Sequence, residues 1–239
     1  MQAISSSPIF LSNYARVVFF TGAGMSAESG VPTYRGRGGI WGQYSWEEYA
    51  CQDAFDADPQ KVLDFHEQRR GKVLGCEPHA GHLHLAALQA RHPGLEIITQ
   101  NTDGMHQRAG ATRVSELHGS LWRMRCPQHG KHEDLAAAAY ARRDCAHCGA
   151  TLRPDITWFG DNVDNAVFAK AQELIATAQL FVAVGTSGIV HPAAGLIPIA
   201  ARGGARMIEI NPEETEMSRL FSQRLRETAG SSLPRLFLD

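Results

Sequence analysis

Four residues lie in two pairs that have the spacing of metal ligands. Cys126 and His129 form the first pair, Cys145 and Cys148 form the second, and two residues separate the members of each pair. Thiolate and imidazole are preferred ligands of tetrahedral zinc, and two such pairs in short succession are typical of a zinc ribbon. Four protein ligands leave no position for water, so we expect zinc to support folding rather than catalysis. The alternatives are a lost site or a substitute ligand, either His132 or His147.

A glycine-rich turn has the spacing of a phosphate-binding loop. Residues 20–30 read FTGAGMSAESG, in which Gly22, Gly24 and Ala27 give the pattern G-x-G-x-x-A. This pattern lets the backbone approach a pyrophosphate at a helix N-terminus, where free N–H groups favour anions. The alternative is a tight strand-to-helix turn without a ligand. A dehydrogenase would also need an acidic residue about 20 positions on, after a second strand. The region after the glycines reads instead as a loop (31–36), so we expect a nucleotide but no simple hydride-transfer layout.

Three polar side chains follow two short apolar runs. Asn101 and Asp103 come at or after the end of run 95–101, and His118 follows RVSEL and precedes a glycine. Because histidine titrates near neutral pH, His118 is a candidate general base. The alternatives are a satisfied core or surface position for His118, a strand cap for Asn101 and a turn role for Asp103.

The elements that must position these residues alternate between strand and helix. Short β-branched or aromatic runs predict buried strands at 16–22, 95–101, 113–119, 180–186 and 205–211. Helical stretches are expected at 26–29, 80–91 and 165–178. This alternation predicts an α/β fold with a doubly wound, Rossmann-like parallel sheet. Ligands of such folds bind beyond the carboxyl ends of the strands, where polar and glycine residues gather in this sequence.

Two segments, 36–80 and 120–154, break the alternation. The first contains Asp58-Pro59, an N-cap followed by proline at the first helical position, and the second contains the four metal-ligand candidates. We expect these insertions to pair into a small helical and zinc-ribbon lobe. The Rossmann-like domain would then comprise residues 1–35, 81–119 and 155–239.

Composition narrows the class of protein. The 239 residues are 44% hydrophobic and 20% charged, which is typical of a globular chain. The formal net charge of −2 provides no field to attract nucleic acid. No apolar run reaches the roughly 18 residues of a membrane helix. Five cysteines at uneven spacing suit reduced thiols or a metal. We therefore expect a cytoplasmic protein with no membrane or specific nucleic-acid partner. A monomer is our expectation for the oligomeric state.

Four ordered motifs resemble the sirtuins, and are nearest to the bacterial class III type. They are GAGMSAESGVPTYRG, TQNTDGMHQRAG, ELHGS and GTSGIVHPAAGL, and the resemblance extends from about Val17 to Asn211. It implies an NAD-dependent protein-lysine deacylase that consumes NAD and releases nicotinamide and O-acyl-ADP-ribose. It also implies acyl-lysine proteins or peptides as substrates and one structural zinc per chain. The family typically has four cysteine ligands, so His129 is a departure.

The resemblance also assigns roles to single residues. Gly22, Ala23 and Gly24 match the phosphate loop; Tyr34 and Arg35 match the flexible cofactor loop, where the family usually has Phe before Arg. Gln100, Asn101 and Asp103 match residues around the nicotinamide ribose and carboxamide. His118 matches the catalytic base, which accepts a proton from a ribose hydroxyl, and Asn101 is the second catalytic candidate. Further cofactor contacts are expected at Glu28, Thr33, Trp41, Gly185, Thr186, Ser187 and Asn211.

Two segments resemble the substrate contacts of sirtuins, which sandwich an extended peptide by strand addition. The first contains Trp158, Phe159 and Gly160, and the second contains Gly188 and Val190. The alternative is that both aromatic residues only fill the core.

The expected acyl pocket contains His66 and Arg69, which share one helix face at i,i+3. Class III sirtuins have Tyr and Arg there, and the pair binds the carboxylate of succinyl- or malonyl-lysine. With Arg kept and Tyr replaced by the shorter His, we expect a wider, less selective pocket. Deacetylation should be robust and desuccinylation detectable. The alternative is a solvated helix face.

Two other functions remain open from sequence. A Rossmann-type NAD oxidoreductase is disfavoured by the missing acidic ribose ligand. A non-catalytic NAD-sensing or zinc-dependent interaction module is disfavoured because Asn101, Asp103 and His118 all follow strands.

Overall fold

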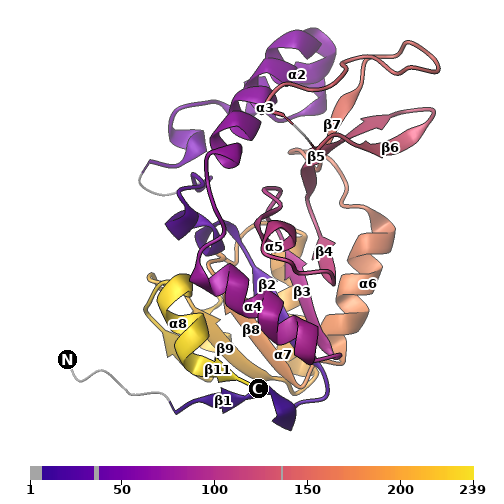
Figure 1. Cartoon of the computed structure of the whole chain (residues 1–239). Helices are drawn as coiled ribbons and strands as arrows, with labels where there is room; N and C mark the ends of the chain where they lie inside the picture. The colour runs from indigo at the N-terminus through magenta and orange to yellow at the C-terminus, as the bar shows by residue number, and fades with distance from the viewer. Residues whose placement is uncertain (1–6, 35–37, 136) are drawn as a thin grey trace.

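The computed structural model describes residues 7–34, 38–135 and 137–239, and its main element is a six-stranded, all-parallel sheet (Figure 1). The sheet has the order β10-β9-β8-β2-β3-β4. Its strands are β2 (Val17–Thr21), β3 (Leu95–Thr99), β4 (Val114–Glu116), β8 (Leu180–Val184), β9 (Arg206–Ile210) and β10 (Gln223–Leu225). The parallel pairing and the crossover order confirm the predicted α/β fold class.

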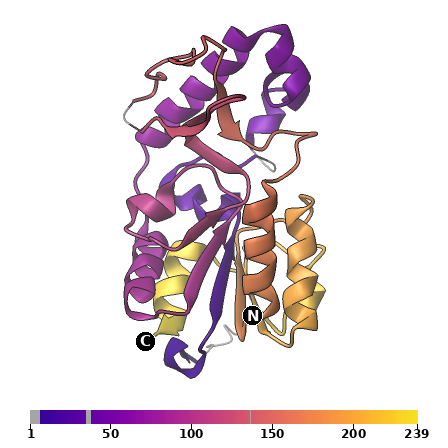
Figure 2. The same cartoon turned by 90° about the vertical axis from the view of Figure 1, so that its right-hand side faces the viewer.

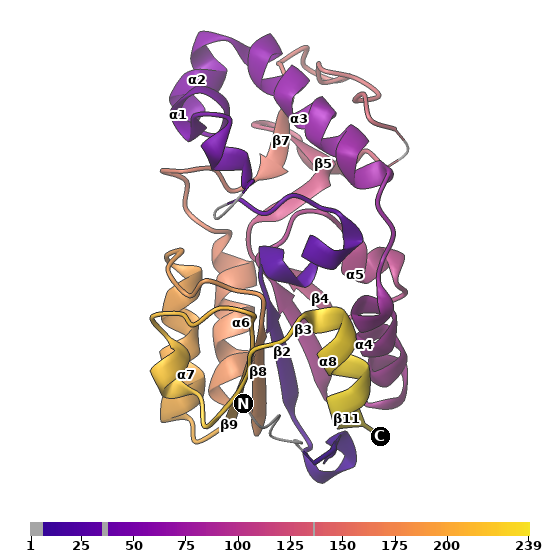
Figure 3. The same ribbon diagram turned by 90° about the vertical axis from the view of Figure 1, so that its left-hand side faces the viewer.

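Helices cover both faces of this sheet (Figure 3). One face packs against α4 (Ala80–Arg91) and α8 (Ala229–Leu236), and the other against α6 (Asn165–Ala176) and α7 (Ile197–Arg202). Central strands β2 and β8 are buried at every residue, which explains why their sequences are continuous apolar runs rather than alternating ones. Along β2, Phe19 packs into one core and Phe20 into the other.

A smaller lobe lies beyond the carboxyl ends of the parallel strands (Figures 1 and 2). Its antiparallel sheet has the order β6-β5-β7, with β5 (Gly119–Cys126), β6 (Gly130–Glu133) and β7 (Arg153–Ile156). Its helices are α1 (Trp46–Tyr49), α2 (Gln52–Ala57) and α3 (Pro59–Leu74). Asp58 caps α3 by accepting a hydrogen bond from the Lys61 N–H, and Pro59 occupies the first turn, as the sequence predicts.

Arg70 joins α3 to the zinc-ribbon part of this lobe. Its side chain is completely buried and donates to the Asp134 carboxylate at 2.8 Å and to the carbonyls of Leu121 and Ala137. The guanidinium also packs on the rings of Trp122 and Tyr140. These contacts link the two insertions, which share one apolar core.

Several elements differ from the sequence-based expectation. The stretch at 26–29 is not an α-helix, because residues 23–25 and 27–29 form two short 3-10 turns. Strand β7 extends the small sheet to Ile156, beyond the expected boundary at 154. The short strand β10 and the parallel pair of β1 (Ile9–Phe10) with β11 (Phe237–Leu238) were not expected, nor was α5 (Met105–Arg108). No helix in the described ranges is long and apolar enough to cross a membrane.

Candidate functional site

A cavity of about 540 Å³ lies between the carboxyl ends of the parallel strands and the small lobe. Strands β2, β3, β4, β8 and β9 each contribute the residues that follow them, as expected for a doubly wound sheet. The predicted site residues that line it are Gly22, Ala23, Gly24, Thr33, Tyr34, Trp41, His66, Arg69, Gln100, Asn101, His118, Trp158, Phe159, Gly160, Gly185, Thr186, Ser187, Val190 and Asn211. The fold therefore gathers residues that are far apart in the sequence around one space.

Close contact between two loops explains the glycines of the phosphate-loop motif. A Cβ at Gly22 would lie 2.8 Å from the Gly185 carbonyl oxygen, and one at Gly24 would lie 2.7 Å from the Gly185 Cα. Gly185 itself has φ +59°, and a Cβ there would meet the backbone of Gly24. Side chains at these positions would separate the loop after β2 from the loop after β8. The glycines thus bring two backbone segments together at the edge of the cavity.

His118 is held so that one ring nitrogen carries the proton and the other does not. Its Nδ1 lies 2.9 Å from the Gln100 carbonyl oxygen, which can only accept, so Nδ1–H donates. In the neutral ring, Nε2 then has the free lone pair of a base. Burial lowers the pKa of His118, and the bond to Gln100 partly opposes this shift. The lowered pKa keeps His118 neutral near physiological pH, the form that a general base requires.

The amide of Asn101 is oriented by the phosphate loop. Its Nδ2 donates to the Gly22 carbonyl at 3.0 Å and to Ser26 Oγ at 3.3 Å. Both amide hydrogens are thereby used, which leaves Oδ1 as the atom that Asn101 can offer a ligand. Thr186 connects two further strand ends. Its hydroxyl accepts a hydrogen bond from Gln100 Nε2, and its backbone carbonyl accepts one from Asn211 Nδ2.

Asp103 lines a second, smaller cavity that adjoins the first, together with Ala23, Tyr34, Arg69 and Asn101. Its Oδ1 accepts the Met105 N–H at 2.9 Å, at the start of α5. Burial raises the pKa of Asp103, while the bonds from Met105 and Ser26 oppose the shift. The carboxyl group is therefore fixed in orientation beside Asn101, although it does not line the main cavity.

Besides Asp103, two described residues of the predicted site, Glu28 and Gly188, do not line the main cavity. Glu28 accepts hydrogen bonds from Thr228 Oγ1 at 2.8 Å and from the Gly230 N–H at 2.6 Å, so its carboxylate caps α8. Gly188 adopts φ +69°, and a Cβ there would lie 2.7 Å from Met217, which explains the glycine by backbone conformation and packing. Arg35 lies outside the described residues.

The wall opposite the phosphate loop is built from α3 and the segment after β7. Trp158 Nε1 donates to His66 Nε2 at 3.2 Å, and the two rings stack. Arg69, one turn along α3, donates to the Tyr34 hydroxyl. Burial, followed by the charges of Arg69 and Arg153, lowers the pKa of His66 well below its usual value, so the imidazole is neutral.

Sequence reasoning missed the ion pair that shapes the segment after β7. Arg153 pairs with Asp161, lies over the Trp158 ring at 3.7 Å, and is largely buried. Asp161 also accepts the Trp158 N–H at 3.0 Å, which folds residues 158–161 into a turn. Phe159 N–H donates to the Ala50 carbonyl and thereby ties this turn to the helical insertion. No local pattern marks these partners, which come from different elements.

A second missed feature is a group of three histidines behind the phosphate loop, of which His82 and His106 are buried and His79 is half-buried. His79 Nε2 donates to the Met25 carbonyl at 2.6 Å, and its Nδ1 accepts the Gly81 N–H as the cap of α4. The His82 ring packs against the His79 ring on one side and against the His106 ring on the other. The i,i+3 spacing of His79 and His82 could have indicated the first contact from sequence.

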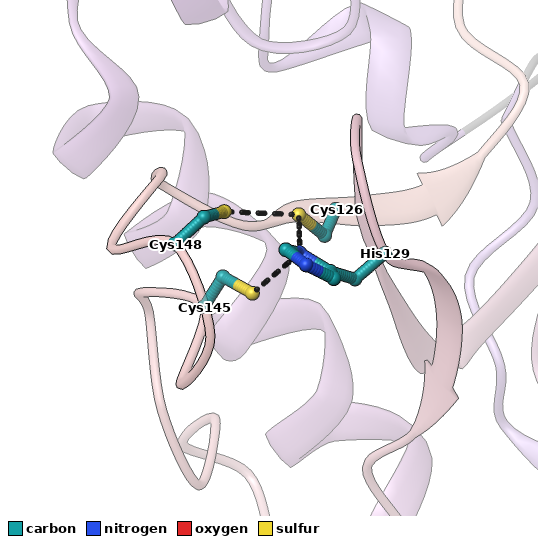
Figure 4. Close-up of side chains that lie close together, drawn as sticks. All are labelled: Cys126, His129, Cys145 and Cys148. Carbon is teal, nitrogen blue, oxygen red and sulfur yellow. Dashed lines mark hydrogen bonds between the residues drawn. The ribbon is translucent and has the colours of Figure 1, made fainter.

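The four predicted zinc ligands converge in the small lobe (Figure 4). Their ligand atoms lie within 4.8 Å of one another, and no other such His, Cys or carboxylate group occurs among the described residues. His129 Nδ1 is 3.5 Å from both Cys126 Sγ and Cys145 Sγ, and Cys126 Sγ is 3.6 Å from Cys148 Sγ. A tetrahedral zinc with bonds of about 2.3 Å places two sulfurs about 3.8 Å apart, so the cluster fits zinc.

The thiol chemistry of this cluster is consistent with metal binding. Backbone N–H groups of His147 and Cys148 lower the pKa of Cys145 to about 6, which favours the thiolate that binds metal. His132 lies on β6 opposite Met124, and His147 is not one of the four converging residues. The structure therefore favours His129 over both substitute ligands.

Comparisons with known proteins agree with this geometry. A model of the Sir2 family matches residues 22–192. The NAD-dependent protein deacylase of Aquifex aeolicus (strain VF5) is 39% identical over 223 residues, which are 92% of this chain and 93% of that protein. A crystal structure of a Sir2 homologue–NAD complex is 38% identical, with a TM-score of 0.85 over 93% of this chain and 88% of that chain. A Sir2 variant with a deacetylated p53 peptide and 3′-O-acetyl ADP-ribose is 29% identical, with a TM-score of 0.82 over 94% of this chain and 93% of that chain. The chain therefore belongs to the Sir2 family.

Proposed function

We propose that this chain is an NAD-dependent protein-lysine deacylase that transfers the acyl group of a modified lysine to ADP-ribose and releases nicotinamide. The observation that carries the proposal is the position of His118, with one nitrogen fixed to Gln100, in the same cavity as the phosphate loop. A base and a nucleotide-binding loop that share one cavity are what such a transfer requires. The names of its relatives support the same activity.

The residues present suit NAD as a co-substrate. The phosphate loop and the turn 185–187 would hold the pyrophosphate and the adenosine side, together with Asn211, while Gln100, Asn101 and Asp103 would hold the nicotinamide ribose and its carboxamide. When bound, NAD supplies the ribose carbon that accepts the acyl oxygen and the nicotinamide that leaves. Asn101 offers Oδ1 because both of its amide hydrogens are already used. Trp41 and Tyr34, with ring centroids 5.7 Å apart, would exclude water from that end of the cavity.

His118 would act as the general base. Its Nε2 is free to accept the proton of a ribose hydroxyl, and Nδ1 stays fixed to the Gln100 carbonyl as the imidazolium forms. Since burial lowers the pKa of His118, the neutral form predominates at physiological pH. The same burial disfavours the charged form, which favours transfer of the proton onward to the departing lysine amine; nicotinamide leaves as a neutral molecule and needs no proton.

The acyl-lysine substrate would enter between residues 158–160 and 188–190. Both segments contribute to the lining of the cavity, through Trp158, Phe159, Gly160, Ile189 and Val190. Peptide addition between two backbone segments tolerates many side chains, which suits substrates that share only a modified lysine. The solved relative with a deacetylated p53 peptide supports this class of substrate. We retain deacetylation as the robust activity and desuccinylation as a weaker one.

The zinc cluster would hold one metal ion in a structural role. All four ligands come from the protein, so no coordination position is open to substrate. The cytoplasmic location, the monomeric state and the division into two domains remain predictions.

Mass spectrometry of a panel of acyl-lysine peptides, incubated with and without NAD, tests the proposal. We expect free lysine, nicotinamide and O-acyl-ADP-ribose only when NAD is present. Formation of a reduced nicotinamide without loss of the acyl group would instead indicate an oxidoreductase. Binding of NAD with no change in any peptide would indicate a sensing module.

A further inference from the structure

The Arg69 guanidinium lines both cavities without a carboxylate partner. Among the described residues, it donates a hydrogen bond to the Tyr34 hydroxyl, lies 3.5 Å from His66 Nδ1, and packs on the rings of Tyr34 and Phe65. The carboxylates that line the main cavity come from residue 161 and from residues 213–216. Asp103 lines the smaller cavity with Arg69, and the charge of Arg69 opposes the rise in the pKa of Asp103, but the two side chains form no ion pair among the described residues. Buried or half-buried charges are normally paired, so an unpaired guanidinium facing a cavity indicates a place for an anionic ligand.

Tyr34 presents a hydroxyl to the same place. Arg69 Nη2 lies 2.5 Å from the Tyr34 oxygen and must donate, because a guanidinium has no acceptor. The hydroxyl hydrogen of Tyr34 is therefore left to donate, and Thr102 Oγ1, at 3.4 Å, is only a long acceptor. An acceptor group at this position would receive an O–H from Tyr34 and N–H groups from Arg69.

His66 cannot supply this second donor as well as Tyr34 can. Its Nε2 accepts the Trp158 indole N–H, which is a donor only, so the single proton of the neutral ring is on Nδ1. Nδ1–H and Arg69 Nη1 are then both donors, and their 3.5 Å contact is not a hydrogen bond. The His66 side chain is also fully buried, whereas Tyr34 is partly exposed to the cavity.

We propose that Tyr34 determines acyl specificity, with its hydroxyl and the Arg69 guanidinium together holding the terminal carboxylate of a dicarboxylic acyl group on lysine, such as succinyl. This inference rests on the proposed function and adds a residue to it. Tyr34 belongs to the segment that follows the phosphate loop. Its hydrogen bond to the acyl carboxylate would therefore also fix the position of this segment beside the cofactor.

The test compares kcat/KM for succinyl-lysine and acetyl-lysine peptides of the same sequence at saturating NAD. Tyr34→Phe removes only the hydroxyl, and Tyr49→Phe is the matched control, because Tyr49 packs on Phe65 but has no contact with Arg69 among the described residues. We expect Tyr34→Phe to lower the succinyl-to-acetyl ratio about tenfold, the usual effect of losing one hydrogen bond to a charged group. Tyr49→Phe should leave the ratio at the wild-type value.

Further variants keep the test decisive. Arg69→Lys retains the positive charge but not the two parallel N–H donors of the guanidinium, so it should also lower the succinyl-to-acetyl ratio. Tyr34→Phe combined with Arg69→Met should have the same ratio as Arg69→Met alone. Calorimetric binding of the succinyl peptide without NAD should weaken in Tyr34→Phe by the same factor.

Two negative results have different meanings. An unchanged ratio in Tyr34→Phe, or a wild-type protein that deacetylates but does not desuccinylate, overturns this inference and leaves the proposed function intact. A wild-type protein that removes no acyl group in the presence of NAD overturns the proposed function itself.

Discussion

His82 and His106 meet edge to face behind the phosphate loop, with ring centroids 5.0 Å apart. His106 Nε2 lies 3.0 Å from Thr21 Oγ1, and His82 Nε2 lies 3.4 Å from Ser26 Oγ. In the described part of the chain, the Nδ1 atom of each ring is buried without a hydrogen-bond partner. Burial lowers the pKa of His82 to about 2 and that of His106 to about 3. Both rings are therefore neutral in the folded protein.

This pair predicts a loss of stability in mild acid. Unfolded histidine titrates near pH 6.5, so below that pH the unfolded chain binds protons that the folded chain cannot, and the free energy of unfolding falls. Each histidine should cost about 2 kcal/mol at about pH 5 relative to about pH 8, and little further change should occur above about pH 7. Urea unfolding across this range measures the slope. The buried His66 and His118 add to the same slope, so His82→Gln should remove only its own share, about 2 kcal/mol between about pH 8 and 5, whereas His84→Gln on the same helix is the matched control. A flat profile between about pH 5 and 7 would mean that the rings do not stay neutral.

The role of His118 as a base predicts a large kinetic effect with little structural change. His118→Ala should lower deacetylation by roughly 10²–10⁴-fold, as expected for loss of a general base, with NAD binding largely intact. Steady-state kinetics and calorimetric NAD titration measure the two quantities. The matched control is His92→Ala, in which a histidine bonded to the carbonyls of Leu11 and Tyr14 is removed far from the cavity. Near wild-type turnover in His118→Ala would exclude it as the base.

The Cys₃His cluster predicts about one zinc per chain and a thermal stability that depends on it. Cys145→Ser and Cys148→Ser should lose both the metal and stability, because a structural zinc site contributes to folding. Cys76→Ser, which alters a thiol outside the cluster, is the control for removal of a cysteine. Elemental analysis and thermal unfolding provide the readouts. If His129→Ala retains zinc, then another ligand completes the site; if the wild-type protein is stable and active without metal, the cluster has no structural role.

The strands that position the site could be predicted because they are buried on both faces. A run such as residues 95–99 needs no periodicity to be identified when every residue but one is buried. Strands β1, β10 and β11 contain only two or three residues each, and so they carry too little pattern to be recognised. The stretch after the glycine motif was expected to be helical, but the close approach of Gly24 to Gly185 fits two tight turns there.

The site was predictable where chain order alone brings residues together, and not where distant side chains meet. Strand ends place Asn101 and His118 in one cavity, and ligand spacing identifies the zinc cluster. The cap of α8 by Glu28 joins residues 202 positions apart, and a motif does not show which way its glutamate points. The contact between Tyr34 and Arg69 likewise depends on how the small lobe packs against the loop after β2.

The contact between Gly24 and Gly185 predicts that a single methyl group will disturb cofactor binding. A Cβ at Gly24 would lie 2.7 Å from the Gly185 Cα and 2.9 Å from its carbonyl oxygen, and backbone atoms cannot yield as a flexible side chain can. Gly24→Ala should therefore displace the phosphate loop, raise the KM for NAD at least tenfold, and cost about 1–3 kcal/mol of stability, as overpacking does. Gly195→Ala is the matched control, because a Cβ there meets nothing within 4 Å and the residue lies in a helical turn.

The free energy of unfolding of this control should stay within about 0.5 kcal/mol of the wild-type value. Urea unfolding and NAD-dependent initial rates measure both variants, and an unaltered KM in Gly24→Ala would show that the loop can shift without affecting the cofactor.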